Sequence, residues 1–205
     1  MMNKIKFTMM AMIAFLASAM FTACGSDDDD PASNAELYQQ TVNNTVSSQK
    51  KSDKAILLVA FGSTWEQAYD TFDKITEEYK ANFQGWDIYL SFSSAICINN
   101  ARSGENEAPR DFFSPEHWLT AIGKAGYKQI VVQSLQVIPG EEYRNVRDIY
   151  VKNFMNNHHN DFTTAYMKSI DRQVVMGLPL MAEEIDAQNL ATTLNQEADV
   201  KAAVA

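Results

Sequence analysis

Short apolar runs rich in β-branched residues alternate along the chain with stretches in which apolar residues recur at helical spacing. The apolar runs predict four strands, over residues 55–61, 86–92, 129–138 and 172–178. The stretches between and after them predict helices over about 63–83, 115–126, 141–156 and 182–195. Because strands joined by helical connections pair in parallel, this order predicts the α/β class: a flavodoxin-like parallel sheet flanked by helices.

The first 23 residues have the pattern of an export signal. A start with two lysines precedes an apolar stretch over residues 7–20, which is too short to span a membrane. Phe21-Thr22-Ala23-Cys24 then resembles a bacterial lipobox, in which the cysteine carries the lipid after cleavage. We therefore predict a lipoprotein signal peptide over residues 1–23, a lipid on Cys24, and a location on the periplasmic side of a membrane or at the cell surface. The alternative is an ordinary secretory signal followed by a chance cysteine.

The residues after the leader predict a tether and then one folded domain. Residues 24–53 are acidic and polar, with four consecutive aspartates, and predict a solvated tether with one short helix near residues 35–41. The folded domain is expected over residues 54–205. Its last residues, 199–205, look like the start of a fifth strand, so we expect a chain that is cut there.

Charge and cysteine content narrow the classes of function. The chain has 26 acidic and 17 basic residues, a formal charge of −9. Nucleic-acid binding through phosphates needs clustered lysine and arginine, so that class is excluded. A cationic or metal-bearing partner fits the charge, although an acidic surface also simply favours solubility. Beyond Cys24 the one cysteine is Cys97, in an apolar run that predicts a buried, inert thiol.

Candidate chemistry lies where the third predicted strand ends. Pro139-Gly140 makes a turn, and Glu141 and Glu142 follow it at the start of a helix. In open α/β sheets the carboxyl ends of the strands form the ligand-binding edge, where a carboxylate can accept a proton or hold a cation. The alternative is that both acids have no chemical role and are present because the helix dipole favours acidic residues in the first turn. Neighbouring helical residues point about 100° apart, so at most one of the two faces a cleft squarely.

The loop after the first strand, Gly62-Ser63-Thr64-Trp65, reaches the same predicted edge. It contains a single glycine and lacks both the dinucleotide and the Walker phosphate-binding patterns. The hydroxyl groups of Ser63 and Thr64 can bind an anionic group at the start of the following helix, or can instead cap that helix.

Several segments together resemble the anaerobic cobalt chelatases that metallate sirohydrochlorin, a class II tetrapyrrole chelatase family that includes exported members. The resemblance extends over about residues 54–190. The segments that carry it are residues 55–63 at the first strand, 92–98 at the second, Gly126-Tyr127, Val132-Gln133-Ser134-Leu135, Gly140-Glu141-Glu142-Tyr143, and Gly177-Leu178-Pro179-Leu180.

This resemblance implies two similar α/β halves with the macrocycle between them, of which the chain would be the first. It implies that Glu142, at the family's glutamate position, is both metal ligand and catalytic residue. It also implies that Gly62, Ser63 and Thr64 contact the tetrapyrrole's carboxylates and that Trp65 borders the macrocycle. The metal, Co²⁺ above Ni²⁺ or Fe²⁺, is a substrate, and no further cofactor is expected.

The expected function is therefore a sirohydrochlorin cobaltochelatase of anaerobic cobalamin biosynthesis, a lyase. Its expected partners are the tetrapyrrole, a divalent metal, the membrane through Cys24, and a second copy of the chain. His117, His158 and His159 do not fall at the family's metal positions, which are expected in the second half. The alternative is an exported lipoprotein that binds a tetrapyrrole or a metal without catalysis.

Overall fold

The computed structural model describes residues 31–103 and 109–196. The chain divides into two compact units, residues 1–33 and 34–205, and the sheet belongs to the second. The predicted signal peptide, Cys24, the aspartate run and the strand over 199–205 lie outside the described residues. No helix in the described part is both long enough and apolar enough to cross a membrane.

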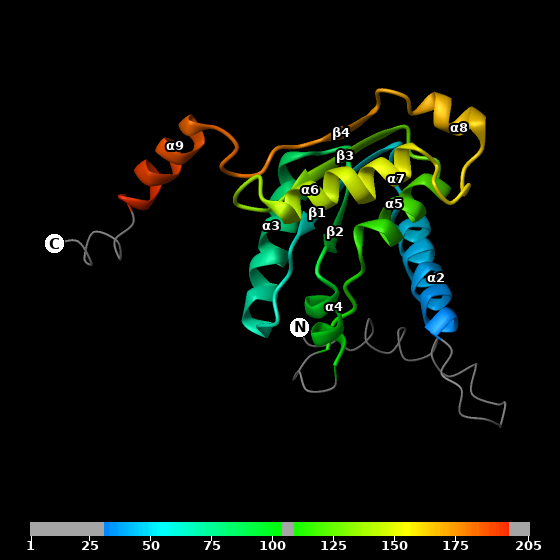
Figure 1. Ribbon diagram of the computed structural model, residues 1–205, viewed down its shortest axis with the longest axis horizontal. Coiled ribbons are helices and arrows are strands. Elements are labelled where there is room, and N and C mark those ends of the chain that lie inside the picture. The colour runs from blue at the N-terminus through cyan, green and yellow to red at the C-terminus, as the bar shows by residue number, and fades with distance from the viewer. Residues whose placement is uncertain (1–30, 104–108, 197–205) are drawn as a thin grey trace, which may run out of the picture. The chain divides into compact units, whose positions relative to one another are not determined.

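Helices and strands alternate along most of the described chain (Figure 1). In chain order they are α2 (Pro31–Gln49), β1 (Lys54–Ala60), the 3₁₀ turn η1 (Glu66–Ala68), α3 (Tyr69–Asn82), β2 (Asp87–Phe92), α4 (Ala95–Arg102), α5 (Pro115–Lys124), β3 (Gln129–Ser134), α6 (Glu141–Asn145), the π-helical segment η2 (Val146–Val151), α7 (Lys152–Met155), α8 (Thr164–Ser169), β4 (Val174–Met176) and α9 (Glu184–Leu194).

The four described strands form one parallel sheet in the order β2-β1-β3-β4. Leu57 at the centre of β1 pairs with Tyr89 on one side and Val132 on the other. The prediction of a parallel, helix-flanked α/β sheet is confirmed. In such a sheet every strand ends at the same edge, which fixes where the loops after β1, β3 and β4 meet.

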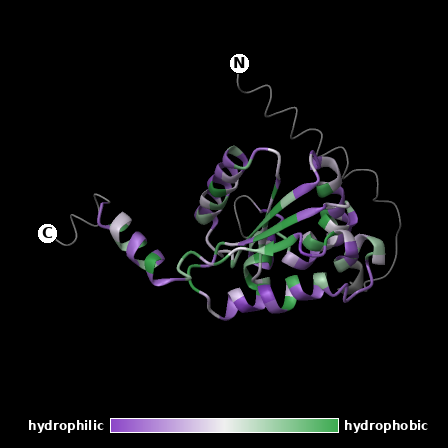
Figure 2. Cartoon of the chain, turned by 90° about the horizontal axis from the view of Figure 1, so that it is seen from above, coloured by the Kyte–Doolittle hydropathy of each residue, from purple (hydrophilic) through white to green (hydrophobic). Residues whose placement is uncertain are grey.

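The two faces of β1 are buried against different helices. Leu57 and Val59 belong to a core cluster shared with α2, α5 and α7, whereas Ile56 and Leu58 pack on the side of α3. Side chains alternate between faces along a strand, so a strand buried on both faces must be apolar throughout. The apolar strands stand out at the centre of Figure 2, with more polar helices around them.

Helix α2 differs from the predicted tether. It extends over residues 31–49, far beyond the short helix expected near 35–41, and its Val42 and Val46 are fully buried in the main core cluster. The ring of Tyr38, one helical turn before Val42, lies edge-on to Phe113. Apolar side chains four residues apart share one helix face, and this narrow stripe packs on the sheet despite its polar surroundings.

Two further segments differ from the sequence-based expectation. Residues 95–102 form α4, a helix that is not among those predicted from the sequence. Its N-cap is Ser94, whose hydroxyl accepts a hydrogen bond from the Cys97 amide. Strand β3 ends at Ser134 rather than at residue 138. The apolar run continues past the last pairing with β1, and its final residues form a loop instead of lengthening the strand.

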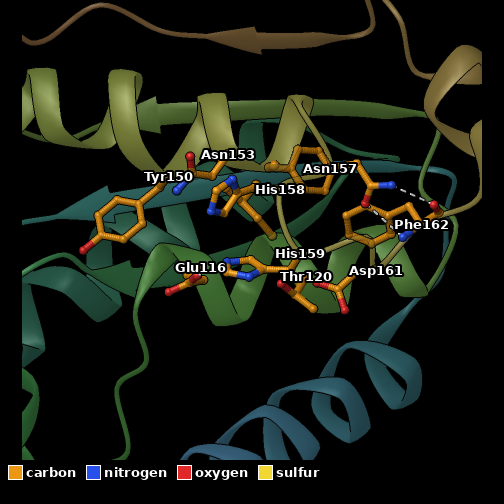
Figure 3. Close-up of a pocket in the computed structure, with 11 residues that line it drawn as sticks. Glu116, Thr120, Tyr150, Asn153, Asn157, His158, His159, Asp161 and Phe162 are labelled. Carbon is orange, nitrogen blue, oxygen red and sulfur yellow. Dashed lines mark hydrogen bonds and ion pairs between the residues drawn. The ribbon is translucent and has the colours of Figure 1, made fainter.

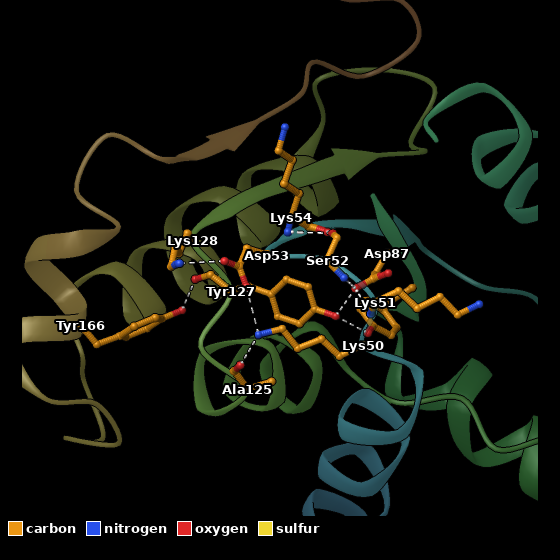
Figure 4. Close-up of polar contacts among 11 residues, drawn as sticks. Lys50, Lys51, Ser52, Asp53, Lys54, Asp87, Ala125, Tyr127, Lys128 and Tyr166 are labelled. Carbon is orange, nitrogen blue, oxygen red and sulfur yellow. Dashed lines mark hydrogen bonds and ion pairs between the residues drawn. The ribbon is translucent and has the colours of Figure 1, made fainter. Parts of the chain in front are cut away.

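The amino edge of the sheet is tied by a buried polar network (Figure 4). The carboxylate of Asp87 accepts hydrogen bonds from the Tyr127 hydroxyl (2.6 Å) and from the backbone amides of Lys51 and Ser52 (2.9 and 3.1 Å). The hydroxyl groups of Tyr127 and Tyr89 are 2.7 Å apart. Burial raises the pKa of the Tyr89 hydroxyl to about 12. These bonds fasten the segment after α2 to the start of β2.

Candidate functional site

An open cleft of about 480 Å³ lies at the carboxyl edge of the sheet. The ends of β1 and β3, the start of α6 and one residue of α3 build its walls. The lining residues are Ala60, Phe61, Gly62, Phe72, Leu135, Gln136, Val137, Ile138, Gly140, Glu141 and Glu142. The two loops expected to meet at this edge, after β1 and after β3, thus face the same cavity.

Gly62 is the point where the first loop turns beneath the cleft. Its φ of +104° lies in a region that side-chain-bearing residues rarely adopt. A Cβ at this position would lie 2.7 Å from the Phe92 ring and 2.8 Å from Cβ of Cys97. The chain therefore requires glycine here for both backbone conformation and space, and the close approach leaves the Gly62 backbone as part of the cleft wall.

Glu141 and Glu142 begin α6 and both line the cleft with exposed side chains. No side-chain cap closes the start of this helix, whose N-cap is Gly140. A carboxylate at a helix start is favoured by the helix dipole. An exposed carboxylate on a cavity wall also remains available to a ligand. The structure thus brings Glu142 and Gly62, as predicted, to one cavity. The predicted role of Glu142 as catalytic residue and metal ligand stays a prediction.

The residues after Gly62 follow a different course from a helix cap. The Ser63 hydroxyl accepts a hydrogen bond from the Trp65 amide (2.9 Å), a local turn. Helix α3 begins only after η1, and neither has a side-chain cap, so the alternative in which Ser63 or Thr64 caps the following helix is wrong. Trp65 is 74% exposed. Ser63, Thr64 and Trp65 adjoin the cleft in sequence but are not among its lining residues, and their predicted contacts with a ligand stay predictions.

The loop after β4 is bonded to the loop after β3. The amides of Leu180 and Met181 donate to the carbonyl oxygens of Gln136 and Val137, at 3.0 and 2.7 Å. Gln133 also donates from Nε2 to the Leu178 carbonyl oxygen at 3.1 Å. These bonds hold the two loops together at the carboxyl edge. The loop after β4 thereby fixes the position of the segment that carries Val137.

Large apolar side chains are exposed around this edge, a feature that the sequence analysis did not identify. At least 44% of each of these side chains is exposed: Phe61, Val137, Ile138, Leu178 and Leu180. Apolar residues grouped in the open are typical of ligand or partner surfaces. The sequence signal for Val137 and Ile138 is the apolar run that continues beyond the end of β3, and this run predicts a longer strand instead.

The three histidines lie away from the cleft lining. His117 is held by a 2.7 Å hydrogen bond between its Nδ1 and the Ser114 hydroxyl, and burial lowers its pKa. These contacts give His117 a structural role in α5. His158 and His159 lie in the loop after α7. In the described part of the chain, no group of three or more His, Cys, Asp or Glu side chains is placed to hold a metal ion. Cys97 is a buried free thiol, as predicted.

Curated proteins that match this chain include two sirohydrochlorin cobaltochelatases. One is a sirohydrochlorin cobaltochelatase of Salmonella typhimurium, 24% identical over 149 residues, which cover 70% of this chain and 48% of the relative. The other is the sirohydrochlorin cobaltochelatase CbiKC of Nitratidesulfovibrio vulgaris, 28% identical over 145 residues, which cover 69% and 44%. The chain thus spans about half the length of the curated relatives it matches.

The family match covers most of the chain and begins where the sheet begins. Residues 54–201 match the family described as "Cobalt chelatase (CbiK)". This range starts at the first residue of β1 and includes every strand of the sheet and both loops that build the cleft. The chain therefore belongs to the cobalt chelatase (CbiK) family.

Proposed function

We propose that this chain is part of a sirohydrochlorin cobaltochelatase, a lyase that inserts Co²⁺ into the tetrapyrrole of anaerobic cobalamin biosynthesis. The observation that carries the proposal is that Glu142 and Gly62 line one cleft in a chain of the cobalt chelatase family. Both relatives named above are sirohydrochlorin cobaltochelatases. The metal and the tetrapyrrole are substrates, and the reaction needs no redox cofactor.

The chemistry of the cleft suits this reaction. Metal insertion replaces two pyrrole N–H protons with one divalent ion, so two protons must leave the macrocycle as the ion sheds its waters. A carboxylate on the cleft wall can take up such a proton or ligate the incoming ion. Glu142 has this position, and the apolar side chains of Val137 and Ile138 offer a surface for the flat faces of the macrocycle.

The loop after β1 is proposed to hold the rim of the substrate. The Gly62 backbone lies in the cleft wall, and the hydroxyl groups of Ser63 and Thr64 follow it directly. Hydroxyl and backbone N–H groups suit the carboxylate side chains of a sirohydrochlorin-type tetrapyrrole. Trp65, which is largely exposed, is proposed to border the macrocycle with its indole ring.

We further propose that the protein is an exported lipoprotein. The support is the sequence Phe21-Thr22-Ala23-Cys24 after an apolar leader, from which a lipid on Cys24 and a membrane location outside the cytoplasm follow. Metabolic labelling with a radioactive fatty acid tests the anchor: the label should enter the wild-type protein and be absent from Cys24→Ala.

A second copy of the chain is the further proposed partner. Sedimentation of the purified protein would reveal such a dimer.

The catalytic proposal is tested by the rate of metal insertion. The full natural gene product should convert sirohydrochlorin and Co²⁺ into the cobalt complex, followed by absorbance. Glu142→Gln removes the charge with little change in shape and should slow insertion at least tenfold. Glu141→Gln is the matched control, because it removes the same charge from the neighbouring residue on the same cleft wall, and it should retain most of the rate.

Each outcome of this comparison has a distinct meaning. Equal rates for the wild type and Glu142→Gln would remove Glu142 from the mechanism. Tight tetrapyrrole binding without insertion of any metal would favour the non-catalytic binding lipoprotein over the chelatase. Faster insertion of Ni²⁺ or Fe²⁺ than of Co²⁺ would keep the reaction class and change its metal.

A further inference from the structure

The loop that carries His158 and His159 is held in a defined shape. Asn157 and Asn160, on either side of the pair, have φ values of +49° and +57°. The side chain of Asn157 accepts from the Phe162 amide and donates to the Phe162 carbonyl oxygen, at 3.0 and 2.8 Å. The His158 amide donates to the carbonyl oxygen of Asn153 at 3.0 Å. The two imidazoles therefore project from a bonded turn.

The two imidazole rings lie next to each other although they belong to consecutive residues. Their ring centroids are 4.9 Å apart and their planes are nearly perpendicular, at 82°. His159 Nε2 lies 3.0 Å from a carboxylate oxygen of Glu116 in α5. About half of each of these last two side chains is exposed, at 56% and 51%. Figure 3 shows the two rings and Glu116 together at the pocket between α5 and α7.

We propose that His158 and His159 form a capture site for a divalent transition-metal ion, with Glu116 as the carboxylate that orients His159. Imidazole nitrogen is a good ligand for Co²⁺, Ni²⁺, Cu²⁺ and Zn²⁺. When Nε2 of His159 donates its proton to Glu116, the lone pair of Nδ1 is free to bind the ion. A ligating histidine commonly donates its other ring N–H to a carboxylate, which fixes its tautomer and raises its basicity.

The site has two protein ligands, and water completes the coordination of the ion. This agrees with the finding that the described residues contain no group of three or more candidate ligands. The other acid of the pocket, Asp161, is paired with Lys124 at 3.3 Å, so these two charges offset each other. A two-ligand site of this kind binds an ion reversibly and exchanges it readily.

This site is separate from the carboxyl-edge cleft, because the two cavities share no lining residue. It also requires neither the tetrapyrrole nor Glu142. Metal binding at the histidine pair can therefore be measured in the absence of sirohydrochlorin, and its failure would leave the proposed chelatase function unaffected.

The test is a Zn²⁺ titration of the full chain observed through its imidazole signals by ¹H–¹⁵N NMR. The sequence contains three histidines, so the spectrum reports on His117, His158 and His159 alone. Zn²⁺ should shift the signals of His158 and His159 together and leave those of His117 in place. Single variants His158→Gln and His159→Gln should each weaken binding at least tenfold, and Glu116→Gln about tenfold.

His117→Gln is the matched control, because it removes an imidazole from the adjoining helix without touching the pocket, and it should bind Zn²⁺ as the wild type does. Thermal melts of all four variants confirm that each is folded. The proposal is overturned when Zn²⁺ shifts neither signal, when it shifts only one of the pair, or when the pair variants bind as tightly as wild type. An unchanged affinity in Glu116→Gln would remove Glu116 from the site.

Discussion

The two edges of the same sheet are built in opposite ways. At the amino edge, Asp87 accepts three hydrogen bonds and Tyr127 joins it to Tyr89, and these three side chains are buried. At the carboxyl edge, Val137 is 50% exposed and Ile138 57%. Glu141 and Glu142 of α6 line an open cleft there. One edge satisfies its polar groups internally, and the other leaves apolar and acidic groups available.

This contrast separates stability from ligand binding. Buried polar groups that are paired hold a fold in one arrangement, and removing a partner is costly. Exposed apolar side chains around a cavity contribute little to the fold of the free chain and gain when a ligand covers them. Substitutions at the amino edge should therefore change unfolding more than binding, and most substitutions at the carboxyl edge should do the reverse.

The largest effect is expected at Gly62, a residue of the carboxyl edge whose substitution should change both unfolding and ligand binding. Gly62→Ala combines an unfavourable positive φ with a Cβ placed against Phe92 and Cys97. We expect a loss of about 2–5 kcal/mol in the free energy of unfolding, measured by urea denaturation, together with weaker tetrapyrrole binding. Gly85→Ala is the control: it shares a positive φ of +83° but has no atom near its Cβ, so it should cost only the backbone part. Equal costs would show that space at Gly62 is not limiting.

The next effect is expected at Asp87. Asp87→Ala leaves the Tyr127 hydroxyl and two backbone amides without their acceptor, and should lower the free energy of unfolding by about 2–3 kcal/mol. Asp87→Asn keeps an acceptor oxygen and should lose less. Tetrapyrrole affinity should be unchanged in both variants at a temperature where they are folded. A lost affinity would mean that the two edges are coupled.

A smaller effect is expected from alkaline pH. The pKa of Tyr89 is raised from 10.0 to about 12, chiefly by burial, so the unfolded chain ionises before the folded one. The contribution of Tyr89 to stability is therefore complete below pH 10 and is lost as the pH rises towards 12. Urea melts between pH 8 and pH 12 should show this decline, and Tyr89→Phe should reduce it. A decline of the same size in Tyr89→Phe would assign it to other groups.

The sheet was predictable from sequence because its strands are buried on both faces. A run such as residues 55–60 has to be apolar at every position, and its short length and the glycine turn that follows it favour a strand over a helix. The parallel arrangement followed from the helical connections, and the meeting of the loops at Gly62 and Glu142 followed from the shared strand direction.

The parts that sequence did not predict depend on tertiary contacts. Helix α2 shows only the stripe of Tyr38, Val42 and Val46 in a polar segment, and its burial is set by the surface that it covers. The exposed apolar residues Val137 and Ile138 were assigned to a longer β3, because a pattern cannot show where pairing with β1 ends. Glu116 and His159 are 43 positions apart in the chain, and nothing in the sequence of either segment indicates their contact.

The proposed function requires the carboxyl-edge cleft to bind the tetrapyrrole, and one pair of variants measures whether it does. Ile138→Glu places a charge on the exposed apolar wall of the cleft, and Gln173→Glu places the same charge in the pocket at the amino edge. Sirohydrochlorin affinity, measured by absorbance titration of the full chain, should fall at least tenfold in Ile138→Glu and match the wild type in Gln173→Glu. Equal affinity in both variants, or a loss confined to Gln173→Glu, would show that the tetrapyrrole does not bind in this cleft.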